Sequence, residues 1–192
     1  MQPDDLTIAG YIGEHYNSPM GLSAAVFTAG LLSWTLLEYV IHGWMAHLHD
    51  TFVAPIHAVH HRDPYAVFAI KAWLPSMAVA ALLFGVFGAA PGAIFYLGLL
   101  CGFAAYEVEH YRIHFAARLA PVERRLRDRH LVHHLRRPTM CLGVVTGFWD
   151  KVFGTEPLRP ELDALCASVR DVPPLSGPSN LHQFLSSLRS SH

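Results

Sequence analysis

Residues 21–45 read GLSAAVFTAGLLSWTLLEYVIHGWM and are almost wholly apolar. Their one acidic or basic side chain apart from histidine, Glu38, stands near the C-terminal end of the segment. A helix needs about 20 predominantly apolar residues to cross the hydrocarbon core of a bilayer. The segment therefore predicts a membrane-spanning helix.

The composition of the whole chain agrees with a membrane protein. Hydrophobic residues make up 52% of the 192 residues and charged residues only 15%, whereas an ordinary soluble domain carries about 25% charged residues. The formal net charge is −1. Affinity for nucleic acid depends on an excess of Lys and Arg, so we expect no nucleic-acid partner.

Two further apolar runs follow, at about 73–90 and 92–106. Between them stands Gly88-Ala89-Ala90-Pro91-Gly92, which is a turn signal because Gly and Pro interrupt helices. Each run is short for a full span. Together they predict a helical hairpin, whose second helix continues to about Phe115.

Basic residues predict the orientation in the membrane. No Lys or Arg occurs before Arg62 or between residues 73 and 111, and eight arginines lie within residues 112–137. By the positive-inside rule, the connection 46–72 and the chain after residue 110 face the cytoplasm. This orientation predicts three crossings. Residues 119–137 are expected to form a helix near the lipid surface, and the arginines of the run 118–137 to bind lipid headgroups.

Histidine is the unusual residue type, with 14 copies, as many as Lys and Arg together. Ten of them form four clusters. These are His42 and His47 in HGWMAH; His57, His60 and His61 in HAVHH; His110 and His114 in HYRIH; and His130, His133 and His134 in HLVHH. The predicted orientation, which came from Lys and Arg alone, places all four clusters on one side of the membrane.

The spacing within the clusters indicates shared helix faces. Residues three and four apart lie on one face of a helix, so each HxxHH motif is predicted to direct its three imidazoles at one point. His42 and His47 are five apart, about 140° around an ideal helix. They are therefore expected to reach different metals or to lie across a helix end.

The number of histidines favours a site with two metals. Neutral imidazole suits iron, zinc, copper and nickel, and a structural zinc takes about four ligands. Ten histidines are enough for two ions with about five nitrogen ligands each. Glu38, Glu107 and Glu109 stand close to the clusters and are predicted to hydrogen-bond the outer N–H of the ligand imidazoles.

At these motifs the sequence resembles the fatty acid hydroxylase/sterol desaturase superfamily, and within it the fatty acid 2-hydroxylase branch. The resemblance covers about residues 36–157. It rests on EYVIHGWMAH, HAVHHRDP, YEVEHYRIH and RHLVHH, in that order, and on the closing segment LGVVTGFWDKVFGTEP.

The resemblance implies an all-α integral membrane bundle of three to four membrane helices with a cytoplasmic, histidine-rich dimetal cap. It implies two iron ions held by the ten clustered histidines, zinc being possible in the purified protein. O2 is the implied co-substrate, and a membrane lipid or fatty acyl chain is hydroxylated. No catalytic residue beyond the metal centre is assigned. The chain has no haem-binding His-Pro-Gly-Gly motif, so electrons are expected from a separate donor such as cytochrome b5 or ferredoxin.

We expect residues 1–171 to form the hydroxylase domain, and 172–192 a linker and a short amphipathic tail with Leu181, Phe184, Leu185 and Leu188 at helical spacing. Three alternatives stay open: a lipid or sterol desaturase with the same site, a carotenoid hydroxylase, and a membrane metal transporter. A transporter predicts ligands spread along a transmembrane path. The sequence gives neither the lipid nor the oligomeric state.

Overall fold

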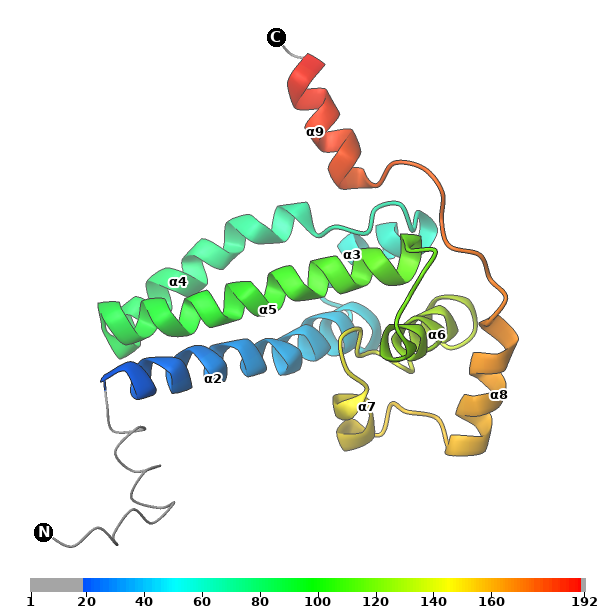
Figure 1. The fold of residues 1–192 in the computed structure, drawn as a ribbon, viewed down its shortest axis with the longest axis horizontal. Helices are drawn as coiled ribbons and strands as arrows, with labels where there is room; N and C mark the ends of the chain where they lie inside the picture. Colours follow the sequence, from blue (N-terminus) through cyan, green and yellow to red (C-terminus); the bar gives the residue numbers. More distant parts are fainter. Residues whose placement is uncertain (1–18, 191–192) are drawn as a thin grey trace, which may run out of the picture. The chain divides into compact units, whose positions relative to one another are not determined.

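The computed structural model describes residues 19–190, with the backbone alone for residues 73–77. Its helices (Figure 1) are α2 (Pro19–Tyr39), the π-helix η1 (Val40–Leu48), α3 (Val53–Arg62), the 3₁₀ turn η2 (Ile70–Ala72), α4 (Trp73–Phe87), α5 (Ala89–Phe115), α6 (Pro121–Leu135), α7 (Phe148–Phe153), α8 (Arg159–Val169) and α9 (Asn180–Ser190). Residues 19–190 contain no strand, which confirms the predicted all-α class. Residues 1–18 of the expected hydroxylase domain and 191–192 of the expected tail lie outside the described residues.

Within residues 19–190, two helices are long and apolar enough to cross a membrane. Helix α2 continues directly into η1, so Pro19–Leu48 forms one helix of 30 residues, and α5 has 27 residues. Helix α4 has 15 residues, fewer than the roughly 20 that a span needs. The number of crossings therefore stays a prediction.

The chain divides into two compact units. Unit 1 comprises residues 19–34 and 74–102 of the described chain, and unit 2 comprises 35–73 and 103–190. All ten clustered histidines belong to unit 2.

In unit 1, helices α2 and α5 touch through their backbones. A Cβ at Gly30 would lie 2.1 Å from the Phe95 carbonyl oxygen, and one at Gly98 would lie 2.2 Å from that of Phe27. Only glycine fits at such distances, and small residues allow this close approach of membrane helices.

The predicted hairpin between α4 and α5 is present in unit 1 (Figure 1). Gly88 separates the two helices and has φ +83, a left-handed conformation that favours glycine. A Cβ at Gly92 would lie 2.6 Å from the Leu83 carbonyl oxygen, so the helices also approach closely just after the turn. Helix α5 ends at Phe115, as the sequence predicted.

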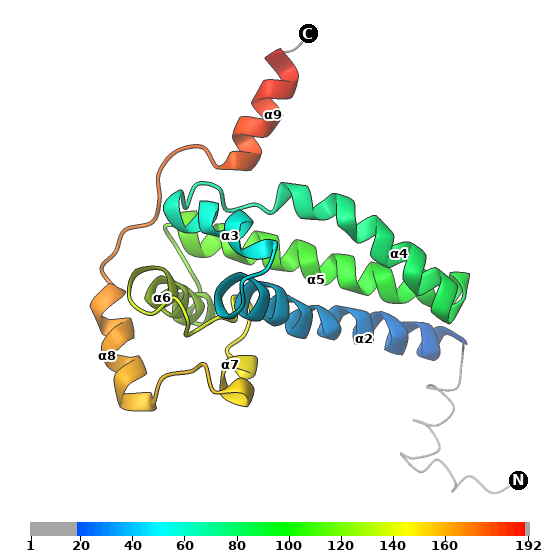
Figure 2. The same ribbon diagram turned by 180° about the vertical axis from the view of Figure 1, so that it is seen from behind.

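In unit 2, α6 and α8 lie side by side (Figure 2) around a small apolar core. Its buried members are Leu131, Val132, Cys141, Leu162 and Val169. Burial also raises the pKa of the Cys141 thiol to about 12, so this cysteine stays protonated and acts as a packing residue.

The basic run differs from its prediction at two arginines. Arg127 is buried and donates to the Ile113 and Val172 carbonyl oxygens at 3.0 and 2.7 Å. Arg129 is buried and pairs with Asp150 and Glu156 at 2.9 and 2.6 Å. The two residues precede His130 and His133 by three and four positions, so they share the inward faces of α6 and do not reach lipid headgroups.

We expect Gly98→Ala to destabilise the contact between α2 and α5, because its methyl group would overlap the Phe27 carbonyl. Overpacking of this kind costs about 1–3 kcal/mol, which thermal unfolding in detergent would detect. Gly85→Ala in α4 is the matched control, since a Cβ there meets nothing within 4 Å. Equal stability of the two variants would contradict the close contact.

Candidate metal centre

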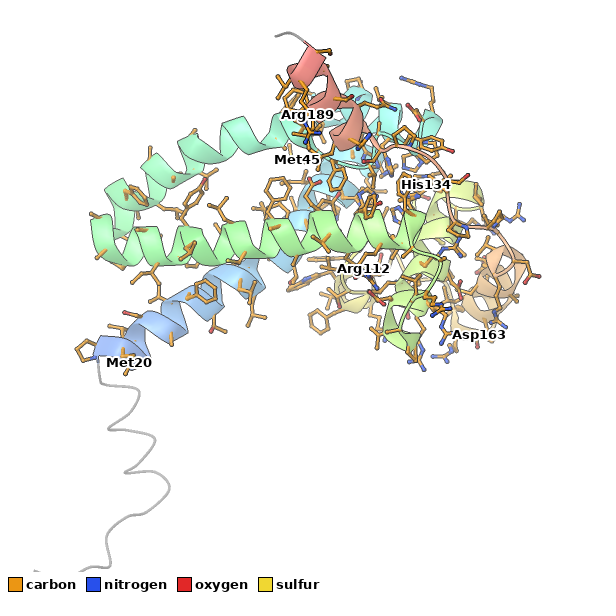
Figure 3. The ribbon with its side chains drawn as sticks, turned by 45° about the horizontal axis from the view of Figure 1, so that its top comes forward. Met20, Met45, Arg112, His134, Asp163 and Arg189 are labelled. Carbon is orange, nitrogen blue, oxygen red and sulfur yellow. The ribbon has the colours of Figure 1, made fainter. Side chains whose placement is uncertain are left out.

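The ten clustered histidines of unit 2 form two groups. Group 1 consists of His42, His47, His57, His61 and His133, and group 2 consists of His60, His110, His114, His130 and His134. Within each group one nitrogen from every side chain lies within 4.8 Å of the others. Figure 3 labels His134, one member of group 2.

The π-helix η1 explains how His42 and His47 enter the same group. A π-helix hydrogen-bonds residues five apart, and such segments are frequent at functional sites. Residues five apart therefore come close to one face, and the two ring centroids lie 5.3 Å from each other. The sequence prediction assumed an ideal α-helix, in which these side chains would diverge.

Each HxxHH motif supplies both groups, which corrects the prediction that its three imidazoles meet at one point. His57 and His61 belong to group 1, and His60 belongs to group 2. In α6 the assignment is reversed, since His133 belongs to group 1. In each motif the first and last histidines, at i and i+4, lie on one helix face and share a group. The middle histidine, at i+3, is turned by about 100° from its neighbour at i+4 and belongs to the other group.

Within the groups the imidazoles face one another through Nε2. The Nε2–Nε2 distances are 3.2 Å for His47–His61 and 3.1 Å for His61–His133 in group 1, and 3.1 Å for His60–His134, 3.1 Å for His60–His110, 3.2 Å for His110–His130 and 2.9 Å for His114–His130 in group 2. A neutral imidazole nitrogen has one hydrogen or one lone pair. His130 Nε2 therefore cannot satisfy both of its neighbours by hydrogen bonding.

A metal ion in each group accounts for this spacing. Metal–imidazole bonds are about 2.0–2.1 Å long, so two ligand nitrogens at right angles around one ion lie about 3.0 Å apart. The observed spacings match that value. The donor set, five imidazoles per group, also suits iron and zinc.

The electrostatics of the groups agree with metal binding. Burial, and then the neighbouring imidazoles, lower the pKa of His57, His60, His130, His133 and His134 well below the usual value for histidine. These side chains are therefore neutral at pH 7, and the neutral imidazole is the form that binds a metal.

Two backbone carbonyls hold the outer nitrogens of two group 1 histidines. His42 Nδ1 donates to the Leu142 oxygen at 2.6 Å, and His133 Nδ1 donates to the Met140 oxygen at 3.2 Å. A hydrogen on Nδ1 leaves the lone pair of a neutral imidazole on Nε2. Sequence reasoning missed these partners, because every residue has a carbonyl and no side chain marks the ones that matter.

The three predicted carboxylates lie as follows. Glu38 Oε1 is 3.9 Å from His42 Nδ1 and accepts from Val144 N at 2.9 Å. Glu107 accepts from Ala69 N at 3.0 and 3.2 Å. Glu109 is partly buried on α5. Their proposed role at the ligand imidazoles stays a prediction.

We expect the purified protein to bind about two metal ions per chain. His61→Ala removes a ligand from group 1 only and should halve the metal content measured by elemental analysis, because the remaining ligands of that group no longer hold an ion tightly. His134→Ala should do the same for group 2. His182→Ala, at an exposed position on α9, is the control and should keep both ions. Full metal content in both group variants would contradict the two-site arrangement.

Known proteins match this chain over the histidine region. A family model described as fatty acid hydroxylase matches residues 27–155. A dihydroceramide fatty acyl 2-hydroxylase of Arabidopsis thaliana is 32% identical over 143 residues, which cover 67% of this chain and 59% of the relative. The human fatty acid 2-hydroxylase is 28% identical over 163 residues, 75% of this chain and 43% of the relative. This chain therefore spans about three fifths or less of these curated relatives.

A solved structure has the same fold. It is described as full-length scs7p with only the hydroxylase domain visible, and it superimposes with a TM-score of 0.63 at 22% identity. The match covers 88% of this chain and 65% of that one.

Proposed function

The chain belongs to the fatty acid hydroxylase family, and we propose that it is a membrane-bound, di-iron, O2-dependent hydroxylase of a fatty acyl chain. One observation carries the proposal. Two adjacent groups of five imidazoles direct their nitrogens at one another in unit 2, which fits two metal ions and an oxidation rather than a structural zinc site.

The protein's own residues hold and isolate the centre. Nε2 atoms of groups 1 and 2 would hold one iron each, and bound iron supplies the activation of O2 and the oxidation of an unactivated C–H bond. Burial of His60, His110, His130 and His133 keeps bulk water away from the inner side of both groups. The carbonyls of Met140 and Leu142 orient two of the imidazoles.

An apolar hollow in unit 2 is our candidate for the acyl chain. It has a volume of about 310 Å³ and is lined by Phe68, Ile70, Ala104, Glu107, Val108 and Leu181. Glu107 precedes the group 2 residue His110 by one turn of α5, so the hollow adjoins the helix segment that carries metal ligands. The relatives' names extend the proposal to carbon 2 of a fatty acyl chain, free or in a ceramide.

We further propose that the protein is a multi-pass membrane protein whose metal centre faces the cytoplasm and receives electrons from a separate donor such as cytochrome b5 or ferredoxin. Two long apolar helices and the distribution of arginines support this orientation. The gathering of the histidines into adjacent groups disfavours a metal transporter, whose ligands would follow a path. A desaturase with the same centre is the second candidate.

Mass spectrometry with ¹⁸O2 tests the reaction. We expect the iron-loaded protein, in vesicles with a fatty acid or ceramide and an electron donor, to yield a product that carries one ¹⁸O atom. His61→Ala and His134→Ala should yield none, and His182→Ala should be active. A product lighter by two hydrogens would favour the desaturase. Unchanged lipid across a broad panel, in protein shown to hold two irons, would contradict both.

Ala104→Phe tests the hollow as the acyl site. The larger side chain would fill part of the hollow that Ala104 lines. We expect turnover to fall at least about tenfold, the loss of roughly 1.4 kcal/mol of transition-state stabilisation, while metal content stays at the wild-type level. Ala105→Phe makes the same change at an exposed position of α5 outside the lining. Equal turnover of the two variants would place the acyl chain elsewhere.

A further inference from the structure

Residues 140–144, between α6 and α7, form a short segment that we call the strap. Two of its carbonyls accept from group 1 histidines: Met140 O from His133 and Leu142 O from His42. The strap therefore lies directly against the outer nitrogens of two group 1 histidines.

The N–H groups of the strap are fixed by acceptors from elsewhere in unit 2. Leu142 N and Gly143 N donate to the two carboxylate oxygens of Asp150 at 2.7 and 3.1 Å. Cys141 N donates to the Thr155 carbonyl oxygen at 3.0 Å. Val144 N donates to Glu38 at 2.9 Å. Each residue from 141 to 144 is thus held through its backbone.

The strap has a conformation that it would not adopt alone. Cys141 has φ +54, in the left-handed region that a residue with a side chain rarely occupies. A Cβ at Gly143 would lie 2.1 Å from the Thr146 carbonyl oxygen, so the following turn is closed tightly. Such a backbone persists only where its surroundings impose it.

Asp150 accepts two of the four hydrogen bonds that hold the strap, more than either of the other acceptors, Thr155 and Glu38. It is fully buried in α7, and its carboxylate accepts four hydrogen bonds. Besides the two from the strap, Oδ1 accepts from the Thr155 hydroxyl at 2.7 Å, and Oδ2 accepts from Arg129 at 2.9 Å. A buried carboxylate with a paired cation and satisfied oxygens is a rigid anchor, and loss of one partner is costly.

We propose that Asp150 is a positioning residue for the metal held by group 1, acting through the strap carbonyls on His42 and His133. Asp150 holds the peptide of Leu142 O through Gly143 N, and it reaches the peptide of Met140 O through Thr155, which binds Asp150 by its hydroxyl and accepts from Cys141 N by its carbonyl. These contacts keep the hydrogen of each imidazole on Nδ1 and the lone pair of Nε2 directed at the ion. Outer partners of this kind orient ligand imidazoles and raise their basicity. The inference rests on the proposed function only in requiring a metal in group 1.

Only the metal of group 1 should depend on the strap. Both strap carbonyls contact histidines of group 1, so loosening the strap should weaken the metal of group 1 and leave that of group 2. A residue with only a structural role would weaken both ions together. Affinity measured separately for the two groups distinguishes these cases.

Two single-site proteins provide that measurement. His134→Ala leaves group 1 intact, and His61→Ala leaves group 2 intact. Metal-free forms of both, in full-length chains, are titrated with Co²⁺ and followed by visible absorption. Asp150→Asn keeps the size of the side chain but replaces one acceptor oxygen with a donor. We expect it to weaken Co²⁺ binding about 10–100-fold in the His134→Ala protein, with a shifted absorption band, and to leave the His61→Ala protein unchanged.

Asp163→Asn is the matched control. It makes the same chemical change at Asp163 on α8, which Figure 3 labels. The side chain of Asp163 is exposed and pairs with Arg159, and we expect the change to alter neither affinity. If Asp150→Asn does not fold, Thr155→Val removes one hydrogen bond to Asp150 and should give a smaller loss confined to group 1. Equal losses in both single-site proteins, or no loss in the one that keeps group 1, would overturn the role of Asp150. Parent proteins that bind no Co²⁺ would overturn the metal sites themselves, and this role with them.

Discussion

Imidazole nitrogens that face each other at about 3 Å need a proton or a cation between them, since two lone pairs repel. In the described part of unit 2 six pairs of Nε2 atoms lie at 2.9–3.2 Å. A neutral Nε2 has one hydrogen or one lone pair and can serve one neighbour, yet four of these nitrogens face two neighbours each, those of His60, His61, His110 and His130. Burial disfavours a second proton on these rings, so a metal ion in each group fits all six contacts. The π-helix, the buried arginines and the strap all serve to keep these nitrogens together.

The two groups draw their histidines from the helices in a reciprocal way. Helix η1 gives two histidines to group 1, and α5 gives two to group 2. Helix α3 gives two to group 1 and one to group 2, and α6 gives one to group 1 and two to group 2. The groups touch where His61 and His134 stack with ring centroids 4.2 Å apart. Each HxxHH helix therefore fixes the position of one group relative to the other.

The sequence predicted the apolar helices, the end of α5 and the gathering of the ten histidines, because apolar length and i,i+4 spacing are local properties of the chain. It did not predict α7 and α8. It did not predict how the histidines divide. The direction of His60 and His133 depends on which helix lies on each side of α3 and α6, and His42 and His47 share a group only because η1 is a π-helix. Arg127 and Arg129 were predicted to be surface cations, yet both are buried on α6, on the same helix faces as His130 and His133. The strap carbonyls carry no sequence signal at all.

The glycine contacts of unit 1 close the seam between α2 and α5 at two points. With Gly30 and Gly98 packed against the backbones of α5 and α2, no space wide enough for a hydrocarbon chain is left at this seam. If the protein acts on an acyl chain in a bilayer, as proposed, that chain cannot pass between α2 and α5 at these two glycines. The acyl substrate of the proposed function would then have to approach the protein from a side other than this seam.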